Sequence, residues 1–404
     1  MTEQSRRGPL DGIRVVDMTR HMAGPYGAAM LADYGAVVVK IEPKYGDQAR
    51  QIGRDFVDGE SGLFLTWNRG KQSIAVDYRT PEGRAVVDRL VAEADVFLHN
   101  FRPRSARQAG LDFETLRQIN PTIVHACVTG FGSVGPWADR PATDPVIQAM
   151  SGVMGVTGPR GEPPVLVGIP VADFTGAMLQ VIGVLMALRD RDATNEAQEV
   201  EVSMLAGLMS ALTTRVSSVL YGGYEPEAMG SAHSAVMPYQ AFEASDGYVI
   251  AGTWGDAGWP RFCSAIEMPE LENDERFATN QLRLENRDEL ESILSERFAR
   301  RTRAEWDEAF RVADALFGHV YKVSEALEQE QAEASQLFCE VEHSKIGPLK
   351  MLAPPIRISS AGRRKLDPPP LLGEHTVGIL RSIGYDEELI QRLVDDGIVV
   401  DGTP

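Results

Sequence analysis

The sequence predicts an α/β fold, with a doubly wound parallel sheet in a large domain and a smaller α+β domain. Two observations predict it. Up to residue 131, short β-branched runs alternate with helical segments, which is typical of a parallel sheet covered by helices on both faces. From about residue 200 the pattern changes, and charged amphipathic helices fill about 258–335. The chain has 404 residues, enough for two or three domains.

The first strand–helix–strand unit is predicted at residues 13–43. The run "IRVVDMT" at 13–19 is a strand candidate. "MAGPYGAAMLADYG" follows it, with Gly and Pro at the helix entry and Gly35 at its exit. "AVVVKIEP" at 36–43 then predicts a second strand, closed by a proline. Such a βαβ unit is the start of a parallel sheet.

The alternation continues along the chain. Strands are expected at 73–78, 95–101 and 123–131, with helices at 81–93 and 112–119. Residues 199–221 are expected to form one long helix. The segment 239–254 predicts two strands that turn at Asp246-Gly247. Charged helices are expected over 258–335, and the final helices end near 396.

These elements predict a large domain made of both ends of the chain. Residues 1–224 form its N-terminal part, residues 225–330 form the small domain, and residues 331–404 return to the large domain.

The charge and cysteine content limit the function classes. A net charge of -18 disfavours nucleic acid as a partner. Three widely spaced cysteines and scattered histidines predict neither a disulfide framework nor a metal site. The N-terminal residues have no apolar core of a signal peptide, so a cytoplasmic protein is expected. The apolar run from Gly176 to Leu188 is expected to be a buried core helix, because it is short for a membrane span.

Asp173 stands at the start of that apolar helix, in "VADFTGAM". Aspartate is a favoured N-cap, since its carboxylate accepts hydrogen bonds from first-turn amides. A carboxylate held ionised at a helix start can also be a nucleophile. The pattern favours the cap, and the two roles are compatible.

Two clusters of cations follow predicted strands or turns. "NRGKQSI" places Arg69 and Lys71 beside a glycine, which suits a phosphate site and an ordinary charged turn equally. "NFRPRSARQ" carries Arg102, Arg104 and Arg107 after a predicted strand, where ligands bind in open α/β sheets. No G-x-G-x-x-G fingerprint follows the first strand, so a dinucleotide cofactor is not expected.

Taken together, the motifs resemble those of the class III (CaiB/BaiF-type) CoA-transferase family. The matching stretches are "GIRVVDMTRHMAGPYGAAMLADYGAVVVKIEP", "NRGKQSIAVD", "HNFRP", "TGFGSVGP", "DPVIQAMSGVMGVTG", "VADFTGAM", "MPYQAFEASDGYVIAG" and "RFATNQLRLENRDEL". They occur in the family's order across almost the whole chain, and together they are specific.

The resemblance implies a Rossmann-like large domain, an interlocked homodimer, and acyl-CoA and carboxylic acid substrates with no permanently bound cofactor. It implies that Asp173 is the catalytic nucleophile. Backbone amides at the helix start are then expected near the developing oxyanions. His233 lies in the Gly/Ser loop "MGSAHSAVMPY" and is expected in a substrate loop, with a solvated loop histidine as the alternative. Trp254 and Trp259 are expected either to line the acid pocket or to be core or interface aromatics. The resemblance also places a set of residues at the CoA site: Thr19, Arg20, His21, Ala23, Lys44, Lys71, Asn100, Phe101, Arg102, Arg104 and Gln108.

Two departures from related patterns bear on the activity. Gln108 stands where the family often has an arginine, with Arg104 and Arg107 beside it. The related 2-methylacyl-CoA racemases carry a histidine in a "GHD"-type motif, and this chain has Ala142, Thr143 and Asp144 there. A racemase needs two acid/base groups, so CoA transfer is expected and racemisation or another acyl-CoA isomerisation is the alternative. The sequence motifs indicate CoA transfer without specifying which acids are the donor and the acceptor.

Overall fold

The computed structural model describes residues 8–359 and 366–403, which divide into two compact units. Unit 1 comprises Met1–Val153, Leu166–Ser217 and Glu333–Pro404, and unit 2 comprises Met154–Val165 and Ser218–Ala332. The sequence placed the boundaries at 224/225 and 330/331. It assigned the segment Met154–Val165 to the large domain, whereas this segment packs with unit 2.

Unit 1 is built on a seven-stranded sheet in the order β14-β5-β2-β1-β6-β7-β8. Every neighbouring pair is parallel except β14 with β5. The strand order runs outward in opposite directions from β1, so the β1–β6 boundary is the topological switch point. The strands are β1 (Arg14–Asp17), β2 (Val37–Glu42), β5 (Lys71–Val76), β6 (Val96–His99), β7 (Val124–Thr129), β8 (Gln198–Ser203) and β14 (Val399–Val400).

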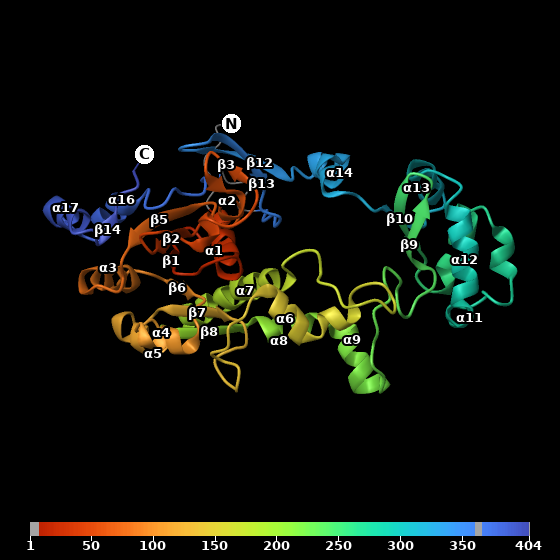
Figure 1. The fold of residues 1–404 in the computed structure, drawn as a ribbon, viewed down its shortest axis with the longest axis horizontal. Coiled ribbons are helices and arrows are strands. Elements are labelled where there is room, and N and C mark those ends of the chain that lie inside the picture. Colours follow the sequence, from red (N-terminus) through yellow and green to blue (C-terminus); the bar gives the residue numbers. More distant parts are fainter. Residues whose placement is uncertain (1–7, 360–365, 404) are drawn as a thin grey trace. The chain divides into compact units, whose positions relative to one another are not determined.

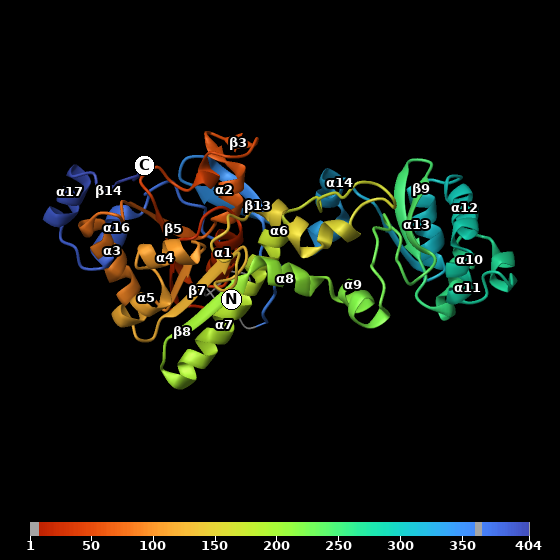
Figure 2. The ribbon, with the colours of Figure 1, turned by 60° about the horizontal axis from the view of Figure 1, so that its bottom comes forward.

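Helices cover both faces of this sheet, as the sequence predicted (Figure 2). Val15, Val38 and Val96 point to one face, where α1 (Ala23–Asp33) and α7 (Val171–Thr194) pack on them. Val16 and Phe97 point to the other face, against α3 (Pro81–Ala92), α5 (Phe113–Ile119), α16 (Thr376–Ser382) and α17 (Glu387–Asp395). Since side chains alternate along a strand, two apolar faces require the continuous apolar runs seen in the sequence.

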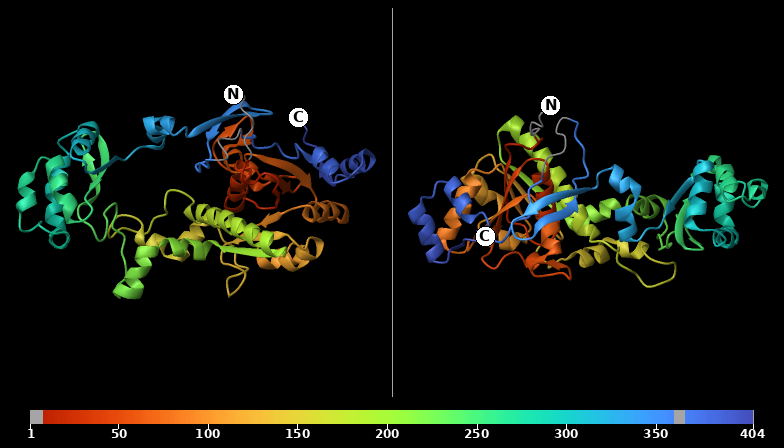
Figure 3. Two further views of the ribbon diagram at one scale, coloured as in Figure 1. Left: turned by 180° about the vertical axis from the view of Figure 1, so that it is seen from behind. Right: turned by 90° about the horizontal axis from the view of Figure 1, so that it is seen from above.

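The C-terminal segment returns to unit 1. In Figure 3 the blue C-terminal helices lie beside the orange N-terminal ones. β14 pairs with β5, and the amide of His375 donates to the carbonyl of Ser73 at 3.0 Å. The two ends of the chain therefore form one core.

The expected long helix at 199–221 is wrong in its first part. Residues Gln198–Ser203 form β8, followed by α8 (Met204–Ala211) and α9 (Thr213–Ser217). The sequence E-V-E-V alternates with period two: Glu199 and Glu201 are exposed, while Val202 is buried beside the neighbouring strand β7. This alternation is a strand signal that the apolar residues downstream obscured.

Helix α7 is longer than the apolar run that predicted it, and its length and composition would suffice to cross a membrane. In its apolar 18-residue window, 39% of the residues are buried inside the structure. Ala177, Val184 and Leu188 pack in the core of unit 1. Gly27 of α1 makes a close approach possible, because a Cβ there would lie 2.5 Å from the side-chain amide oxygen of Gln180. One face of α7 is thus a core face.

Unit 2 has its own sheet and core (Figure 1). The antiparallel strands β9 (Tyr239–Ala244), β10 (Gly247–Gly252) and β11 (Leu316–His319) form the sheet, and the predicted turn at Asp246-Gly247 joins the first two. Aromatic side chains fill the core, with Phe242 stacked on Phe298 at 4.4 Å between ring centroids. The helices are α10 (Trp259–Ala265), α11 (Asn280–Glu285), α12 (Arg287–Phe298), α13 (Arg303–Val312) and α14 (Val323–Glu328). β11 interrupts the segment that the sequence assigned to helices alone.

The remaining α-helices and β-strands are short. They are β3 (Phe56–Val57), β4 (Glu60–Ser61), α2 (Gly62–Trp67), α4 (Pro103–Gln108), α6 (Asp144–Ser151), α15 (Glu330–Ala334), β12 (Phe338–His343) and β13 (Gly347–Leu352).

Candidate active site

A pocket of about 600 Å³ opens in unit 1 at the carboxyl ends of β1, β6 and β7. This is the sheet edge at the β1–β6 switch point, where ligands of doubly wound folds bind. Seven of the sequence-predicted site residues line it: Arg20, His21, Ala23, Asn100, Phe101, Arg102 and Asp173. The structure therefore brings together residues that lie more than 150 positions apart.

The turn between β1 and α1 forms one wall of the pocket. The amide of Arg20 donates to Oδ1 of Asn100 at 3.0 Å, and Nδ2 of Asn100 donates back to the carbonyl of Arg20 at 2.7 Å. His21 has a φ of 64°, a left-handed conformation that is uncommon outside glycine. Its amide donates to Asp47 at 3.4 Å. Side chains from two other segments thus fix this turn.

Buried charges lie directly beneath the same turn. The ammonium of Lys71 contacts the carboxylate of Asp17 at 2.7 Å, and both side chains are fully buried. Burial alone raises the pKa of Asp17, but Lys71 and Lys40 outweigh it and hold that pKa below its usual value. Lys40 also donates to the carbonyl of Thr19 at 2.9 Å. This ionic cluster supports the turn from inside the sheet.

Lys71 and Thr19 consequently do not line the pocket. Burial lowers the pKa of Lys71 to about 8, although Asp17 acts in the opposite direction. Its ammonium also donates to Asn68 at 2.8 Å, so the structure does not fit the expected phosphate contact. Thr19 is buried and donates through its amide to Asp17 at 2.9 Å. Both residues therefore support the β1–α1 turn from inside the sheet and do not contact the pocket.

Asp173 lies in the first turn of α7, but it is not the N-cap. The N-cap is Pro170, and Asp173 is the third helical residue. Among the residues that the structure describes, none donates a hydrogen bond to its carboxylate. The carboxylate is therefore directed to the pocket without a structural partner. On this point the favoured sequence interpretation was wrong.

Asp144 performs the capping instead. Its Oδ1 accepts from the amides of Ala172 at 2.7 Å and Asp173 at 3.2 Å. The amides of Val171 and Phe174 donate to the carbonyls of Ile169 and Pro170. The first-turn amides of α7 are thus occupied, so they do not face an oxyanion as the sequence suggested.

Asp173 has a strongly perturbed pKa. Burial raises the pKa of its carboxyl to about 7, and the nearby charge of Asp144 adds to the effect. A carboxylate that is costly to keep ionised is more basic, and more nucleophilic once ionised, than an ordinary aspartate. By contrast, burial raises the pKa of Cys127 and of Cys263 to about 12, which leaves those thiols protonated at neutral pH.

A second pocket of about 220 Å³ adjoins the first, since Arg20 lines both. It holds two aromatic rings, Tyr45 and Tyr78, and two further cations, Lys44 and Arg79. Nη2 of Arg20 donates to the hydroxyl of Tyr78 at 2.8 Å. Aromatic and cationic groups beside each other suit a nucleotide. Lys44 is thus placed at this end of the groove.

Three further predicted residues, besides Thr19 and Lys71, lie outside both pockets. The amide of Arg104 donates to Asp139 at 2.8 Å, and Gln108 ends α4 on the surface. His233 belongs to unit 2, where its ring stacks on Tyr239 and meets Trp254 edge-on. Trp259, the second aromatic candidate for the acid pocket, is a core residue of unit 2.

Sequence reasoning missed several pocket residues. No local sequence motif indicates a ligand-binding role for the segments that carry them. These residues are Arg140 in the first pocket and Tyr45, Tyr78 and Arg79 in the second. In the sequence, Asp144 stands out only as the neighbour of the position where racemases carry a histidine. The position of each segment beyond a strand's carboxyl end is the signal that could have found the tyrosines.

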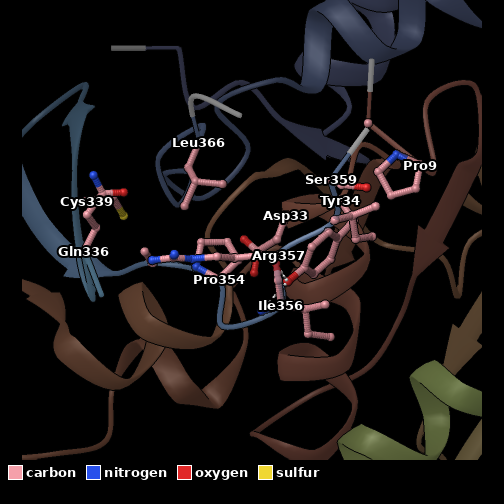
Figure 4. Close-up of a pocket in the computed structure, with 13 residues that line it drawn as sticks. Pro9, Asp33, Tyr34, Gln336, Cys339, Pro354, Ile356, Arg357, Ser359 and Leu366 are labelled. Carbon is pink, nitrogen blue, oxygen red and sulfur yellow. Dashed lines mark hydrogen bonds between the residues drawn. The ribbon is translucent and has the colours of Figure 1, made fainter. Parts of the chain in front are cut away.

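A separate pocket of about 350 Å³ lies elsewhere in unit 1 (Figure 4). The hydroxyl of Tyr34 bonds both the amide and the carbonyl of Ile356, each at 2.9 Å. Asp33 lines this pocket, but Arg69 holds its carboxylate at 2.6 Å. Arg69 is therefore a structural partner and does not belong to a phosphate site.

The described residues contain no group of three His, Cys, Asp or Glu side chains placed to hold a metal ion. The chemistry that the geometry offers is that of a nucleophilic carboxylate in a cation-lined groove. One end of the groove suits a nucleotide, and the other presents Asp173 to a reacting carbonyl.

Comparisons with known proteins identify the family of the chain and several of its relatives. The family model described as "CoA-transferase family III" matches residues 10–376. The chain is 35% identical over 393 residues to succinyl-CoA:glutarate CoA-transferase of Mus musculus, covering 97% of this chain and 90% of that protein. It is 33% identical over 395 residues to succinate–glutarate CoA-transferase of Agrobacterium fabrum, covering 96% and 98%. The crystal structure of a CaiB/BaiF family protein from Brucella suis superimposes with a TM-score of 0.84 at 35% identity, covering 94% of this chain and all of that one.

Proposed function

The chain belongs to CoA-transferase family III, and from this premise we propose that it moves CoA from an acyl-CoA donor to a free carboxylic acid through an aspartyl-CoA thioester on Asp173. The observation that carries the proposal is the placement of Asp173. It is a partly buried carboxylate with a raised pKa, in a pocket at the switch point of the sheet. It has no hydrogen-bond donor of its own in the described part of the chain.

The proposed reaction consists of four acyl transfers. The Asp173 carboxylate attacks the donor thioester carbonyl, which forms a mixed anhydride and releases CoA thiolate. The thiolate attacks the aspartyl carbonyl, forming the aspartyl-CoA thioester and freeing the donor acid. The acceptor carboxylate then attacks this thioester, giving a second mixed anhydride and the thiolate. The thiolate finally attacks the acceptor carbonyl, which yields the new acyl-CoA and regenerates Asp173.

No step of this sequence needs a proton transfer, since every nucleophile and every leaving group is an anion. The site therefore needs electrostatic stabilisation more than a general base. Arg20, Arg102 and Arg140 line the same pocket as Asp173 and supply positive charge. They offset the charges of the thiolate and of two carboxylates within one site.

The adjoining pocket supports an orientation for CoA. We place its nucleotide beside Tyr45, Tyr78, Lys44 and Arg79, and its thioester beside Asp173. The pantetheine arm would then pass along the turn at Arg20 and the segment Asn100–Arg102.

The relatives support dicarboxylic acids as first substrates to examine. The mouse and Agrobacterium proteins are named for succinate or succinyl-CoA and glutarate. We therefore propose succinyl-CoA as donor and short dicarboxylic acids as acceptors. An interlocked homodimer is proposed as the functional assembly, supported by a row of exposed apolar residues on α7: Ile182, Leu185 and Met186.

The test replaces the nucleophile. Asp173→Ala is expected to lower transfer from succinyl-CoA to glutarate by at least roughly 10³-fold, because the covalent route is lost. Hydroxylamine added to the wild type with succinyl-CoA should convert Asp173 to a hydroxamate, found by mass spectrometry of its peptide. Asp190→Ala, an exposed acid on the same helix, is the matched control and should stay active. Full activity of Asp173→Ala, with CoA binding intact, would reject the proposal.

Racemisation is the alternative, and an isotope experiment separates it. His125 is buried in the sheet with its ring nitrogen 3.1 Å from that of His99, so it does not serve the pocket. His21 lines the pocket and is the acid/base group that a racemase would use together with Asp173. Incubation of a 2-methylacyl-CoA in deuterated water, without an acceptor acid, should leave its α-carbon unlabelled. Deuterium incorporation would favour racemisation over transfer.

A further inference from the structure

We infer that Asp144 is a positioning residue for Asp173: it fixes the first turn of α7 and, through its charge, favours the acylated form of Asp173 over the free carboxylate. This inference rests on the proposed role of Asp173 as nucleophile. Asp144 lies on α6, which packs beside α7 and α8 (Figure 1). It is 8% exposed, and it lines the same pocket as Asp173.

The first observation is a hydrogen-bonded clamp. Asp144 Oδ1 accepts from the amides of Ala172 and Asp173, at 2.7 and 3.2 Å. Its Oδ2 accepts from Nε2 of Gln148 at 2.6 Å. Oε1 of Gln148 in turn accepts from the amide of Val167 at 2.9 Å. Two neighbouring turns of α6 therefore hold the approach to α7 on both sides of its start.

The second observation is the number of donors on Asp144. All three bonds are donated to its oxygens, an arrangement that suits an ionised carboxylate. Asp173 lies against this charge and has no donor of its own among the described residues. Within the described part of the chain, the Asp144 carboxylate therefore accepts three hydrogen bonds and the Asp173 carboxylate accepts none.

This asymmetry has a chemical consequence. Two anions close together in a partly buried site repel each other, and acylation removes one of the two charges. The mixed anhydride and the aspartyl-CoA thioester are neutral at Asp173, so the repulsion ends when either forms. Asp144 therefore raises the reactivity of the free carboxylate and lowers the relative energy of the covalent intermediates.

Other charged groups of the pocket come from neighbouring elements. Arg20 and His21 come from the β1–α1 turn, Arg102 from the segment after β6, and Arg140 from the segment after β7. α8 contributes Met204, an apolar residue, to the wall. Burial and Asp144 are the two influences that set the pKa of Asp173, and both raise it.

The experiment compares Asp144→Asn with Asp144→Ala. Asparagine keeps a side-chain oxygen for the two amides and removes the charge. The acid limb of the kcat/KM profile should then move to lower pH, and the fraction of enzyme trapped by hydroxylamine should fall. Alanine also removes the cap, so kcat should drop by roughly 10- to 100-fold through misplacement of Asp173. Circular dichroism and CoA calorimetry establish that each variant is folded.

A second readout does not depend on turnover. Carbodiimide with a glycine ester labels protonated carboxyls, so the pH dependence of labelling at Asp173 reports its protonation directly. The labelling midpoint should be lower in Asp144→Asn than in the wild type. The inference would be overturned if Asp144→Asn and the wild type had the same labelling midpoint and the same pH profile of kcat/KM. The proposed role of Asp173 as nucleophile would not be affected by that result. Activity of Asp173→Ala, measured in parallel, would instead remove the proposed function, and the labelling experiment would still report on Asp144.

Discussion

Arg20 and Asn100 exchange two hydrogen bonds across the switch point of the sheet. The Arg20 amide donates to Oδ1 of Asn100 at 3.0 Å, and Nδ2 of Asn100 donates to the Arg20 carbonyl at 2.7 Å. One residue follows β1 and the other follows β6, which are adjacent parallel strands. The pair therefore locks together the two loops that form most of the proposed CoA site.

Asn100→Ala should weaken acyl-CoA binding by roughly 10-fold or more, because two bonds of about 1 kcal/mol each are lost and the turn is released. The loss is expected in the KM for acyl-CoA and in the Kd of CoA by calorimetry, with a smaller change in kcat. Asn273→Ala, at an exposed asparagine of unit 2, is the control. Equal CoA affinities of Asn100→Ala and the wild type would mean that the exchange of bonds does not shape the site.

A substitution of Lys71 tests whether its ammonium stabilises the fold by pairing with Asp17 or contacts a phosphate of CoA. Lys71→Met leaves Asp17 buried without its partner, which should destabilise the fold by about 3–5 kcal/mol. Thermal unfolding should record the loss, and Asp17→Asn combined with Lys71→Met should recover part of it. A variant that kept the wild-type unfolding temperature but bound CoA with reduced salt dependence would show that Lys71 touches a phosphate after all.

Strands β1, β2, β5, β6 and β7 of unit 1 were predictable from sequence, because short β-branched runs alternate there with helical segments, whereas the two-residue strand β14 was not predicted. β8 was not predicted, because the apolar residues that follow it, in α8, made the whole segment resemble one long helix. Asp173 was found through its motif, but its capping partner Asp144 lies 29 positions away and is visible only in the fold. Lys71 was assigned to a phosphate for the same reason: its partner Asp17 is 54 positions distant.

Asp173 should also reduce the stability of the protein in a pH-dependent way. Its pKa is raised from 3.8 to about 7 in the fold, mainly by burial and then by Asp144. Between these values the folded state binds more protons than the unfolded state, so stability falls as pH rises. Each tenfold change in proton affinity between the two states corresponds to about 1.4 kcal/mol, less what residual solvent screening removes.

Asp173→Asn, which carries no charge, should therefore raise the unfolding temperature above pH 7 and change it little below pH 4. The gain should grow as pH increases through this window, and calorimetry at several pH values measures it. A gain that is the same at every pH would trace to packing, and no gain at pH 8 would contradict the raised pKa.

The apolar row on α7 gives the test of the proposed dimer. Ile182, Leu185 and Met186 recur at helical spacing and are exposed in unit 1, with Met186 67% exposed. Isolated exposed apolar residues are ordinary, but a contiguous row on one helix face marks an interaction surface. A second copy of the chain is the partner that the family resemblance implies.

Met186→Asp should therefore introduce an unpaired charge into the dimer contact and shift the protein towards monomers in light scattering. Val312→Asp, at an equally exposed apolar residue of unit 2, controls for charge and solubility. If both variants had the mass of the wild-type assembly at micromolar concentration, this face of α7 would lie outside the contact. If only Met186→Asp dissociated and its transferase activity fell in parallel, the assembly would be part of the active form, because activity would follow the fraction of dimer.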